Sequence, residues 1–359
     1  NICERKLHLK VKTVHSMKKR YLVLSDGTVF EGYAFGADKT SIGELIFNTN
    51  VVGYIETLTD PNYYGQIVLQ TFPAIGNYGI IESDFIGESK LHGYVVREWC
   101  KAPSNFRCEY DIDKFLKDKD IPGIYGVDTR ELTCILREKG SMNAIICDAV
   151  PDNLDDVKNY KIVNAVENTG SKEASVYLPK TEIKKHIALI DLGSSKNLEV
   201  TLMDKGYKVT VMPYNFKSDD VLALGADAVI ITEGPGDPKE NGAITEEIKN
   251  LFGKLPMFGM GLGHQLMALS QGADTYKLPY GHHGSNQPVK IVGTQRSVIA
   301  AQNHGYAVCK DSMKKGEVSY SNINDGTVEG IAYKADKAFS VQFEPTDEII
   351  AEFLKGLEE

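Results

Sequence analysis

The chain contains 359 residues, of which 42% are hydrophobic and 25% charged, and this ordinary globular composition excludes disorder, collagen and coiled coils. At roughly 150 residues per domain, the length predicts about two domains. The 40 Lys and Arg against 49 Asp and Glu give a net charge of −9, so we expect neither nucleic acid nor a membrane among the partners.

An N-terminal extension is expected over residues 1–20. This segment carries seven Lys and Arg against a single acid, Glu4, but it lacks the apolar stretch of a signal peptide. Met17, followed by Lys-Lys-Arg and an apolar run, is typical of a natural start. The predicted fold therefore begins at Tyr21.

Residues 21–151 are predicted to form a mixed α+β N-terminal domain. Asp26-Gly27, placed between two alternating apolar runs, indicates a β-hairpin. Residues 129–139 have helical spacing, a capping residue at Asp128 or Thr129, and a glycine after the basic last turn. The other expected elements are strands at 21–24, 28–32, 66–71, 93–97 and 124–127 and a helix at 112–117.

A polar and charged segment over residues 152–185 is predicted to be a linker. Beyond it, residues 186–359 alternate strand-like runs with helical patterns, which is typical of βαβ units around a parallel sheet. In such sheets, ligands bind outside the carboxyl ends of the strands. The expected strands are 186–191, 207–212, 226–232 and 256–260, and the expected helices are 195–205, 218–224, 245–253 and 262–271.

The turn between the strand ending at Met260 and the helix starting at Leu262 has the pattern of a nucleophile elbow. No polar linker separates the two elements, so the residue at the turn should be held in a strained conformation above the sheet. That residue is Gly261, which adopts a positive φ at little cost but offers no nucleophile. On the glycines alone, we favour an anion-binding helix N-terminus or close helix–strand packing.

A second glycine loop, Gly234-Pro-Gly236, follows the neighbouring predicted strand. Its backbone N–H groups can point at a developing oxyanion, beside the unpaired N–H groups that begin the 262–271 helix. Gln265 adds an amide one turn into that helix, and residues 302–306 supply a further polar and aromatic cluster. Because these groups converge, the sequence predicts one shared binding pocket.

The six cysteines include no Cys-x-x-Cys pair and form no tight cluster with histidine, so we predict neither a disulfide framework nor a metal site. This cysteine usage is typical of a reducing, cytoplasmic compartment. Cys309 is interpreted as a strand residue packed as a small hydrophobe rather than as a nucleophile. The chain also contains no P-loop, so we expect no ATP chemistry within it.

Collinear sequence blocks extend over nearly all of the chain from Tyr21. They include Gly43-Glu-Leu-Ile-Phe-Asn-Thr, Gly53-Tyr-Ile-Glu-Thr-Leu-Thr-Asp-Pro61, Gly234-Pro-Gly-Asp-Pro238, Gly263-His-Gln265, Gly281-His-His-Gly284 and Ala301-Gln-Asn-His-Gly-Tyr306. In these blocks the chain resembles the small, glutamine amidotransferase subunit of carbamoyl phosphate synthetase. So many blocks in the same order, spread over two domains, argue against chance.

The resemblance implies an α/β protein in which a mixed α+β N-terminal domain precedes a flavodoxin-like class I glutamine amidotransferase domain. Members of this family hydrolyse glutamine and pass the ammonia through a tunnel to a large subunit. That subunit uses ATP and Mg to make carbamoyl phosphate for pyrimidine and arginine biosynthesis. The resemblance therefore implies a ligase complex with a large-subunit partner, as a heterodimer or higher oligomer, and no cofactor in this chain.

The family's glutamine contacts can be carried over by position. They fall on Asn50, Gly234, Gly236, Leu262, Gln265, Asn303, Gly305 and Tyr306. Most suit a physical role, since glycine backbone serves an oxyanion and the amide and aromatic side chains line a polar pocket. Asn50 stands where the family usually has serine, so its assignment is the weakest.

The catalytic triad of the family is missing at all three positions. Gly261 replaces the nucleophilic cysteine, Glu344 stands at the place of the histidine, and Thr346 at that of the orienting glutamate. In an alternative alignment the His-Pro-Glu segment is deleted. With either alignment, no histidine follows His304 in the sequence. A triad acts as a unit, so loss of the nucleophile or base alone costs on the order of a millionfold in rate.

Three hypotheses remain open from the sequence. In the first, the chain is a small subunit with an inactive glutaminase that supports a partner using free ammonia. In the second, the retained pocket is a non-catalytic module that binds glutamine or a related amino acid. In the third, a residual glutaminase uses an unrecognised nucleophile. Whether the chain is itself an enzyme is therefore uncertain from the sequence.

Overall fold

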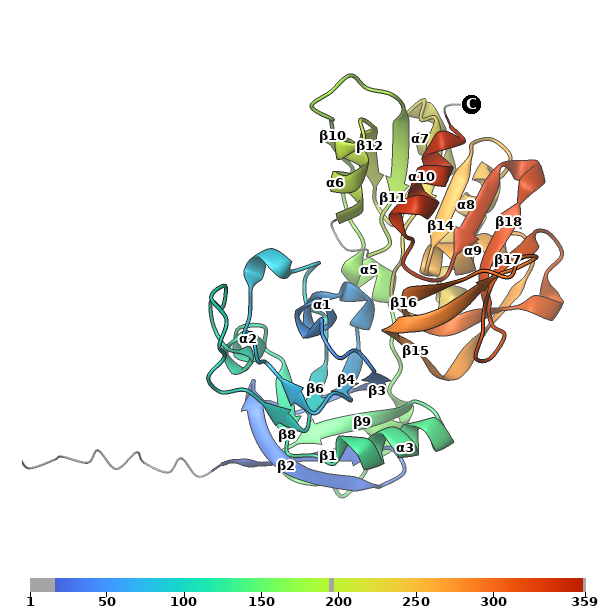
Figure 1. The fold of residues 1–359 in the computed structure, drawn as a ribbon. Helices are drawn as coiled ribbons and strands as arrows, with labels where there is room; N and C mark the ends of the chain where they lie inside the picture. The colour runs from blue at the N-terminus through green and yellow to red at the C-terminus, as the bar shows by residue number, and fades with distance from the viewer. Residues whose placement is uncertain (1–16, 194–196, 358–359) are drawn as a thin grey trace, which may run out of the picture.

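The computed structural model describes residues 17–193 and 197–357, which form two domains in contact with one another (Figure 1). The predicted extension up to residue 16 lies outside the described residues. The first strand, β1, begins at Lys19, two residues before the predicted start of the domain, because the side chain of Arg20 is built into the barrel.

The N-terminal domain is built around a closed barrel with the strand order β1-β2-β8-β6-β4-β3-β9. Apolar side chains of the strands fill its interior, and helix α3 buries Leu132 and Leu136 in the same cluster. Its strands are β1 Lys19–Leu24, β2 Val29–Gly36, β3 Ser41–Asn48, β4 Gln66–Gln70, β6 Gly93–Val96, β8 Pro122–Tyr125 and β9 Met142–Cys147, and its helices are α1 Tyr54–Thr59, α2 Ile112–Asp118 and α3 Thr129–Lys139. A short pair, β5 Ala74–Ile75 and β7 Glu98–Trp99, lies beside it.

The second domain contains a ten-stranded sheet whose central part is parallel. The strand order is β10-β12-β11-β13-β14-β19-β18-β16-β15-β17. Its strands are β10 Ser175–Tyr177, β11 His186–Ile190, β12 Lys208–Met212, β13 Ala228–Ile231, β14 Met257–Met260, β15 Asp274–Ile291, β16 Ser297–Cys309, β17 Glu317–Asn322, β18 Val328–Tyr333 and β19 Ala338–Val341.

Helices cover both faces of this sheet, so the predicted doubly covered α/β architecture is confirmed. The helices α7 Ser218–Ala223, α8 Gly242–Leu251 and α9 Leu262–Ser270 bury apolar residues in one cluster, and α6 Asn197–Asp204 and α10 Asp347–Lys355 do so in the other. The central strands contribute to both clusters. Because both of their faces are buried, these strands appear in the sequence as continuous apolar runs.

Most elements predicted from the sequence are present within a few residues. Helix α3 spans the predicted 129–139, and the side chain of Asp128 accepts hydrogen bonds from the N–H groups of Arg130 and Glu131. The predicted linker, residues 152–185, contains the helices α4 Asp155–Asn159 and α5 Ala165–Thr169 and the strand β10. Because β10 pairs with β12, this segment supplies the edge of the second domain's sheet.

The long hairpin of β15 and β16 reaches from the second domain to the barrel (Figure 1). The carbonyl of His283 accepts from the N–H of Thr49 at 3.2 Å, and the carbonyl of Pro279 accepts from that of Ser141 at 2.6 Å. Phe47 and Tyr280 add an aromatic contact with ring centroids 5.8 Å apart. These backbone bonds fix the position of the hairpin relative to the barrel.

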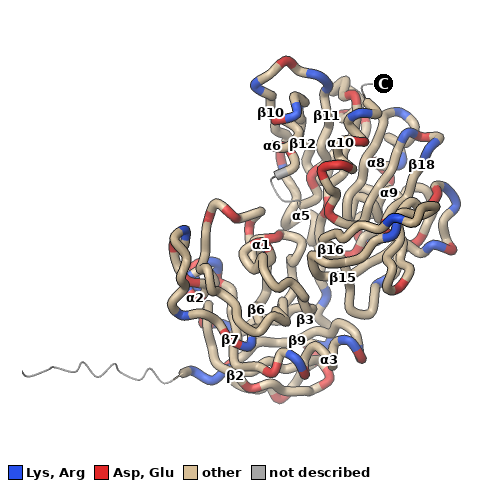
Figure 2. Tube along the Cα trace, viewed as in Figure 1, with Lys and Arg blue, Asp and Glu red and all other residues tan. Residues whose placement is uncertain are grey.

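Charged residues of both signs are distributed over the two domains (Figure 2). Among the described residues, none of the helices combines the length and the apolar composition needed to cross a bilayer.

The side chain of Arg20 ties together several segments of the barrel. It is 1% exposed, and its guanidinium donates to the carbonyls of Ala37 at 3.0 Å and Gly123 at 3.2 Å. Its Nε lies 3.0 Å from a carboxylate oxygen of Asp148, which is half-exposed. Only a planar, charged fork can satisfy these acceptors at once.

We predict that Arg20→Met lowers the free energy of unfolding by ~2–4 kcal/mol, because the carbonyls and the carboxylate lose their donor. Chemical denaturation measures this change. Lys19→Met is the matched control, since Lys19 pairs with Glu31 on the exposed surface and should cost less than ~0.5 kcal/mol. Equal effects of the two substitutions would contradict the role given to Arg20.

Candidate functional site

A cavity of about 590 Å³ lies where the two domains meet, at the carboxyl ends of β13 and β14. Both domains and the intervening segment contribute to its walls. Among the lining residues are Glu44, Tyr64 and Gln66 from the barrel domain, Tyr160 and Lys161 from the intervening segment, and Glu233, Gly234, Gly236, Gly261, Leu262, Gln265, Lys277, His283, Asn303, Gly305 and Tyr306 from the second domain. A polar cavity of this size suits a small metabolite.

The predicted elbow is present at Gly261. This residue joins β14 directly to α9 with φ 52° and ψ −112°, a combination that side-chain-bearing residues rarely adopt. Its N–H donates to the carbonyl of Val341 at 2.9 Å, which holds the turn against the end of β19. The backbone geometry of an elbow is therefore retained although the residue has no side chain.

Close packing of α9 on the sheet places the helix N-terminus at the cavity. The N–H of Gly263 donates to the carbonyl of Thr232 at 3.1 Å, and a Cβ atom on Gly263 would overlap the backbone of Ile231. The start of α9 therefore lies directly beside the loop that follows β13, and Gly234 and Gly236 of that loop line the same cavity. The predicted meeting of the two glycine loops is observed.

The amide of Gln265 is held in a fixed orientation. Its Nε2 donates to the carbonyl of Tyr306 at 2.8 Å and to Oε1 of Gln342 at 2.9 Å, and the side chain is 4% exposed. The amide nitrogen is thus used within the protein, and Gln265 connects α9 to β16 and to the residue after β19.

Asn303 connects the cavity wall to the barrel domain. Its Nδ2 donates to a carboxylate oxygen of Asp60 at 2.8 Å, and its Oδ1 accepts from Nδ1 of His283 at 2.8 Å. Burial lowers the pKa of His283 to about 4, so the ring is neutral at pH 7 and its single proton is the one shared with Asn303. The Nε2 atom of His283 is buried without a protein partner.

Seven of the eight positions carried over as glutamine contacts line the cavity, and Asn50 is the exception. The side-chain oxygen of Asn50 accepts from the N–H of Ser285 at 2.6 Å, and its carbonyl accepts from Nε2 of Gln70 at 2.7 Å. Asn50 therefore contributes to the contact between the domains.

Glu344 and Thr346 do not line the cavity. The N–H of Glu344 donates to the carbonyl of Ala301 at 3.0 Å, and Thr346 precedes α10 without a side-chain cap bond. Although Glu344 keeps exposed surface, desolvation of its carboxyl group raises its pKa, and the nearby charge of Asp60 adds to this rise. These two positions carry a carboxyl and a hydroxyl group, and neither carries an imidazole.

The residues that the sequence did not single out are those of the barrel wall. The carboxylate of Glu44 pairs with Lys277 and accepts from Nε2 of Gln66 at 3.1 Å. These contacts join residues that are distant in the chain, and no local pattern signals them. Glu233, the first residue of the glycine loop after the predicted strand, also lines the cavity, and the sequence predicted no role for its side chain.

The groups that line the cavity suit the binding of a polar ligand. Backbone N–H groups at the helix N-terminus and in the glycine loop suit a polar or anionic group. No cysteine occurs among the described residues that line the cavity. His264, which follows the elbow on α9, is buried and hydrogen-bonded to Oγ of Ser340 at 2.8 Å, and burial lowers its pKa to about 3.

Comparison with known proteins gives matches over both domains. Residues 22–146 match the family model of the carbamoyl-phosphate synthase small chain, CPSase domain, and residues 188–348 match that of glutamine amidotransferase class-I. The chain is 43% identical over 358 residues to the carbamoyl phosphate synthase small chain of Fusobacterium nucleatum, covering 95% of this chain and 99% of that protein.

Two further relatives are similar over most of their length. The carbamoyl phosphate synthase small chain of Clostridium perfringens is 45% identical over 333 residues, covering 91% of this chain and 94% of that protein. The pyrimidine-specific small chain of Halalkalibacterium halodurans is 43% identical over 337 residues, covering 91% of each.

Substitution of Gly261 tests the geometry of the elbow. An added Cβ would lie 2.9 Å from Cβ of Glu233, closer than non-bonded carbons approach, in addition to the strain of a positive φ. We predict that Gly261→Ala destabilises the protein by ~1–3 kcal/mol more than Gly225→Ala, because Gly225 also has a positive φ but no atom within 4 Å of its Cβ position. Thermal and chemical denaturation measure both, and equal losses would contradict the close contact.

Proposed function

The chain belongs to the carbamoyl phosphate synthase small-chain family, and we propose that its amidotransferase domain supports carbamoyl phosphate formation without hydrolysing glutamine at a useful rate. The observation that carries this proposal is the combination of an elbow with its backbone retained and a glycine, Gly261, at its apex. An acyl transfer that passes through a thioester needs a thiol at that position.

The neighbouring positions support the same proposal. Glu344 and Thr346 stand where the resemblance expects a base and the residue that orients it. A carboxylate and a hydroxyl cannot supply the neutral nitrogen that removes a proton from a thiol near pH 7. Because three positions differ together, a single accidental or designed change does not account for the pattern.

We propose that the working partner is a large synthetase subunit that carries ATP and Mg and uses free ammonia. The family supports this partner, and the sequence contains no P-loop for ATP. The small chain would then stabilise or regulate the complex, in the cytoplasm and in the service of pyrimidine or arginine biosynthesis. A residual glutaminase that delivers ammonia remains the alternative.

A second candidate function is recognition of glutamine without turnover. The preserved cavity favours it, because seven carried-over contact positions still line one continuous wall. These residues face a cavity, so a function limited to contact with another subunit would not require them. The cavity touches both domains. Glutamine bound there would therefore couple the supply of this amino acid to the arrangement of the domains in the subunit.

The decisive measurement is carbamoyl phosphate synthesis by the chain together with its cognate large subunit. We expect synthesis from ammonium chloride to proceed and synthesis from glutamine to be at least ~10³-fold slower, because the covalent route is missing. A small chain of the family that carries cysteine, histidine and glutamate at the three positions serves as the positive control. Glutamine-dependent synthesis at a rate similar to this control would overturn the proposal.

Calorimetry with glutamine tests the recognition function separately. We expect a dissociation constant in the millimolar range or tighter, and a loss of at least ~10-fold in Gly305→Ala, because the added methyl group would enter open space in the cavity wall. Gly242→Ala is the control, since its Cβ also meets no atom within 4 Å but lies outside the cavity. No heat of binding at millimolar glutamine would eliminate this function.

A further inference from the structure

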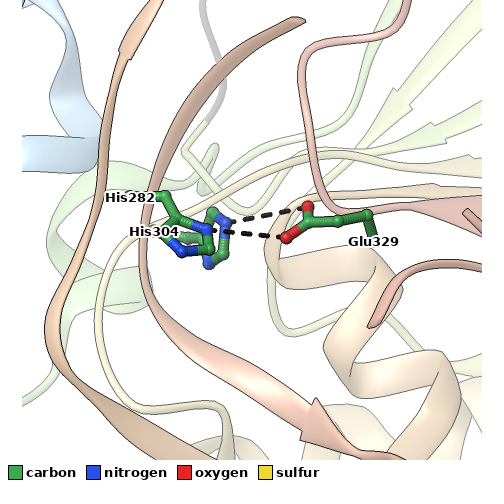
Figure 3. A group of neighbouring side chains, drawn as sticks. All are labelled: His282, His304 and Glu329. Atoms are coloured by element: carbon green, nitrogen blue, oxygen red, sulfur yellow. Dashed lines mark ion pairs between the residues drawn. The ribbon is translucent and has the colours of Figure 1, made fainter. Parts of the chain in front are cut away.

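Three neighbouring strands of the second domain bring together two imidazoles and a carboxylate. His282 on β15 is directly opposite His304 on β16 in the antiparallel register, and Glu329 lies on β18, which pairs with β16 (Figure 3). The three side chains are buried, with exposed fractions of 7%, 8% and 0%. Their potential ligand atoms all lie within 4.8 Å of one another.

The proton of His304 is fixed by its surroundings. Its Nδ1 lies 2.8 Å from the carbonyl oxygen of Tyr306, which can only accept, so Nδ1 carries the proton and Nε2 presents a lone pair. This Nε2 faces Oε2 of Glu329 at 3.9 Å and Oε1 of Gln302 at 3.3 Å. Gln302 cannot turn its amide nitrogen toward the ring without losing a 3.0 Å hydrogen bond from Nε2 to Glu329.

In His282 the roles of the two ring nitrogens are reversed. Its Nε2 lies 2.9 Å from a carboxylate oxygen of Asp325, so the outer nitrogen donates and Nδ1 points inward, 3.5 Å from Oε1 of Glu329. Imidazoles that bind metals characteristically donate their other N–H to a carboxylate or a backbone carbonyl, which orients the ring. Asp325 and the carbonyl of Tyr306 fill these two roles.

Several acceptors face one another in the cluster, and neighbouring donors engage part of them. Oγ1 of Thr327 lies 2.9 Å from Oε1 of Glu329, Nε2 of Gln302 donates to Oε2 at 3.0 Å, and Nδ2 of Asn322 lies 3.5 Å from Nδ1 of His282. The remaining lone pairs of two imidazoles, a carboxylate and an amide oxygen converge on one buried point, and a cation at that point would be stabilised by all of them. We propose that the cluster of His282, His304 and Glu329 binds a divalent transition-metal ion of the zinc type.

The donor set and the spacing suit this ion. Two imidazole nitrogens and one carboxylate oxygen form a common protein ligand set for zinc. Tetrahedral coordination with bonds of about 2.1 Å places ligand atoms about 3.4 Å apart. The separations of 3.5 and 3.9 Å to Glu329, and of at most 4.8 Å for any pair of ligand atoms, therefore need side-chain movements of about 1 Å. Gln302 is close enough to offer a fourth, oxygen ligand.

A proton is the competing occupant. Desolvation opposes charge on His282, but hydrogen bonds to Asp325 and Glu329 outweigh it and raise the pKa of this imidazole to about 9. A proton on Nδ1 of His282 turns this atom into a donor toward Glu329, so the contact between the two side chains becomes favourable. The proton does not change the contact between Nε2 of His304 and the oxygen of Gln302, in which two acceptors still face each other. A metal ion at the centre of the cluster would account for both contacts.

The site lies next to the cavity because His304 lines it, between Asn303 and Gly305. A metal ion would fix the strand that carries these residues. It would therefore act on the cavity through the backbone of β16, independently of whether glutamine is hydrolysed.

The test uses full-length protein treated with a chelator and then titrated with Zn²⁺ by calorimetry, with bound metal counted by elemental analysis. We expect one equivalent whose affinity falls at least ~100-fold in Glu329→Gln and in His282→Gln. Co²⁺ should give the visible absorption of a tetrahedral nitrogen–oxygen site in the wild type alone. His186→Gln is the control, because His186 is also buried but is hydrogen-bonded to Thr210 at 2.7 Å on another part of the sheet.

Circular dichroism of the metal-free proteins separates loss of binding from loss of folding, and Glu329→Gln keeps the size of the side chain. Equal zinc affinity of the wild type and Glu329→Gln would overturn the proposal, as would the absence of any stoichiometric binding by the folded wild type. Nitrogen NMR adds an independent readout, since an imidazolium at His282 in zinc-saturated protein would show that a proton occupies the cluster instead.

Discussion

The close approach of α9 to the ends of β13 and β19 is the constraint on which the site depends. The backbone of Gly263 touches that of Ile231, and the N–H of Gly261 is bonded to Val341. With the helix held this near the sheet, the chain has no room for a gradual turn and must pass through a positive φ at Gly261. The same approach places the helix N-terminus beside the glycine loop, so the geometry of the elbow persists without a reactive side chain.

A second dependence arises because the cavity has walls from two domains. Asn303 reaches Asp60, Lys277 reaches Glu44, and the hairpin backbone bonds to Thr49. These contacts hold the domains together and also shape the cavity. A ligand in the cavity and a protein bound to the barrel domain would therefore act on a common set of hydrogen bonds, which is a physical route for regulation.

Local patterns predicted the parts of the fold that local chemistry determines. Helix α3 begins at a capping aspartate and ends at a glycine, and the strand–turn–helix at Gly261 follows from an apolar run that meets a helix without a linker. The strand β10 was missed because an edge strand of three residues has little hydrophobic signal. The barrel wall of the cavity and the cluster around Glu329 depend on strand register and domain docking, which bring together residues that are distant in the sequence.

The short distance between Gly261 and Glu233 has a consequence for which side chains these two positions can accept together. The Cβ of any side chain at the elbow would lie 2.9 Å from the Cβ of Glu233 and 3.3 Å from its Cα, and no rotation of the Glu233 side chain moves these two atoms. A residue with a side chain at position 261 would therefore require the loop that carries Glu233 to shift. Packing at the elbow thus couples positions 233 and 261, so that the side chain at one position limits what the other can accept.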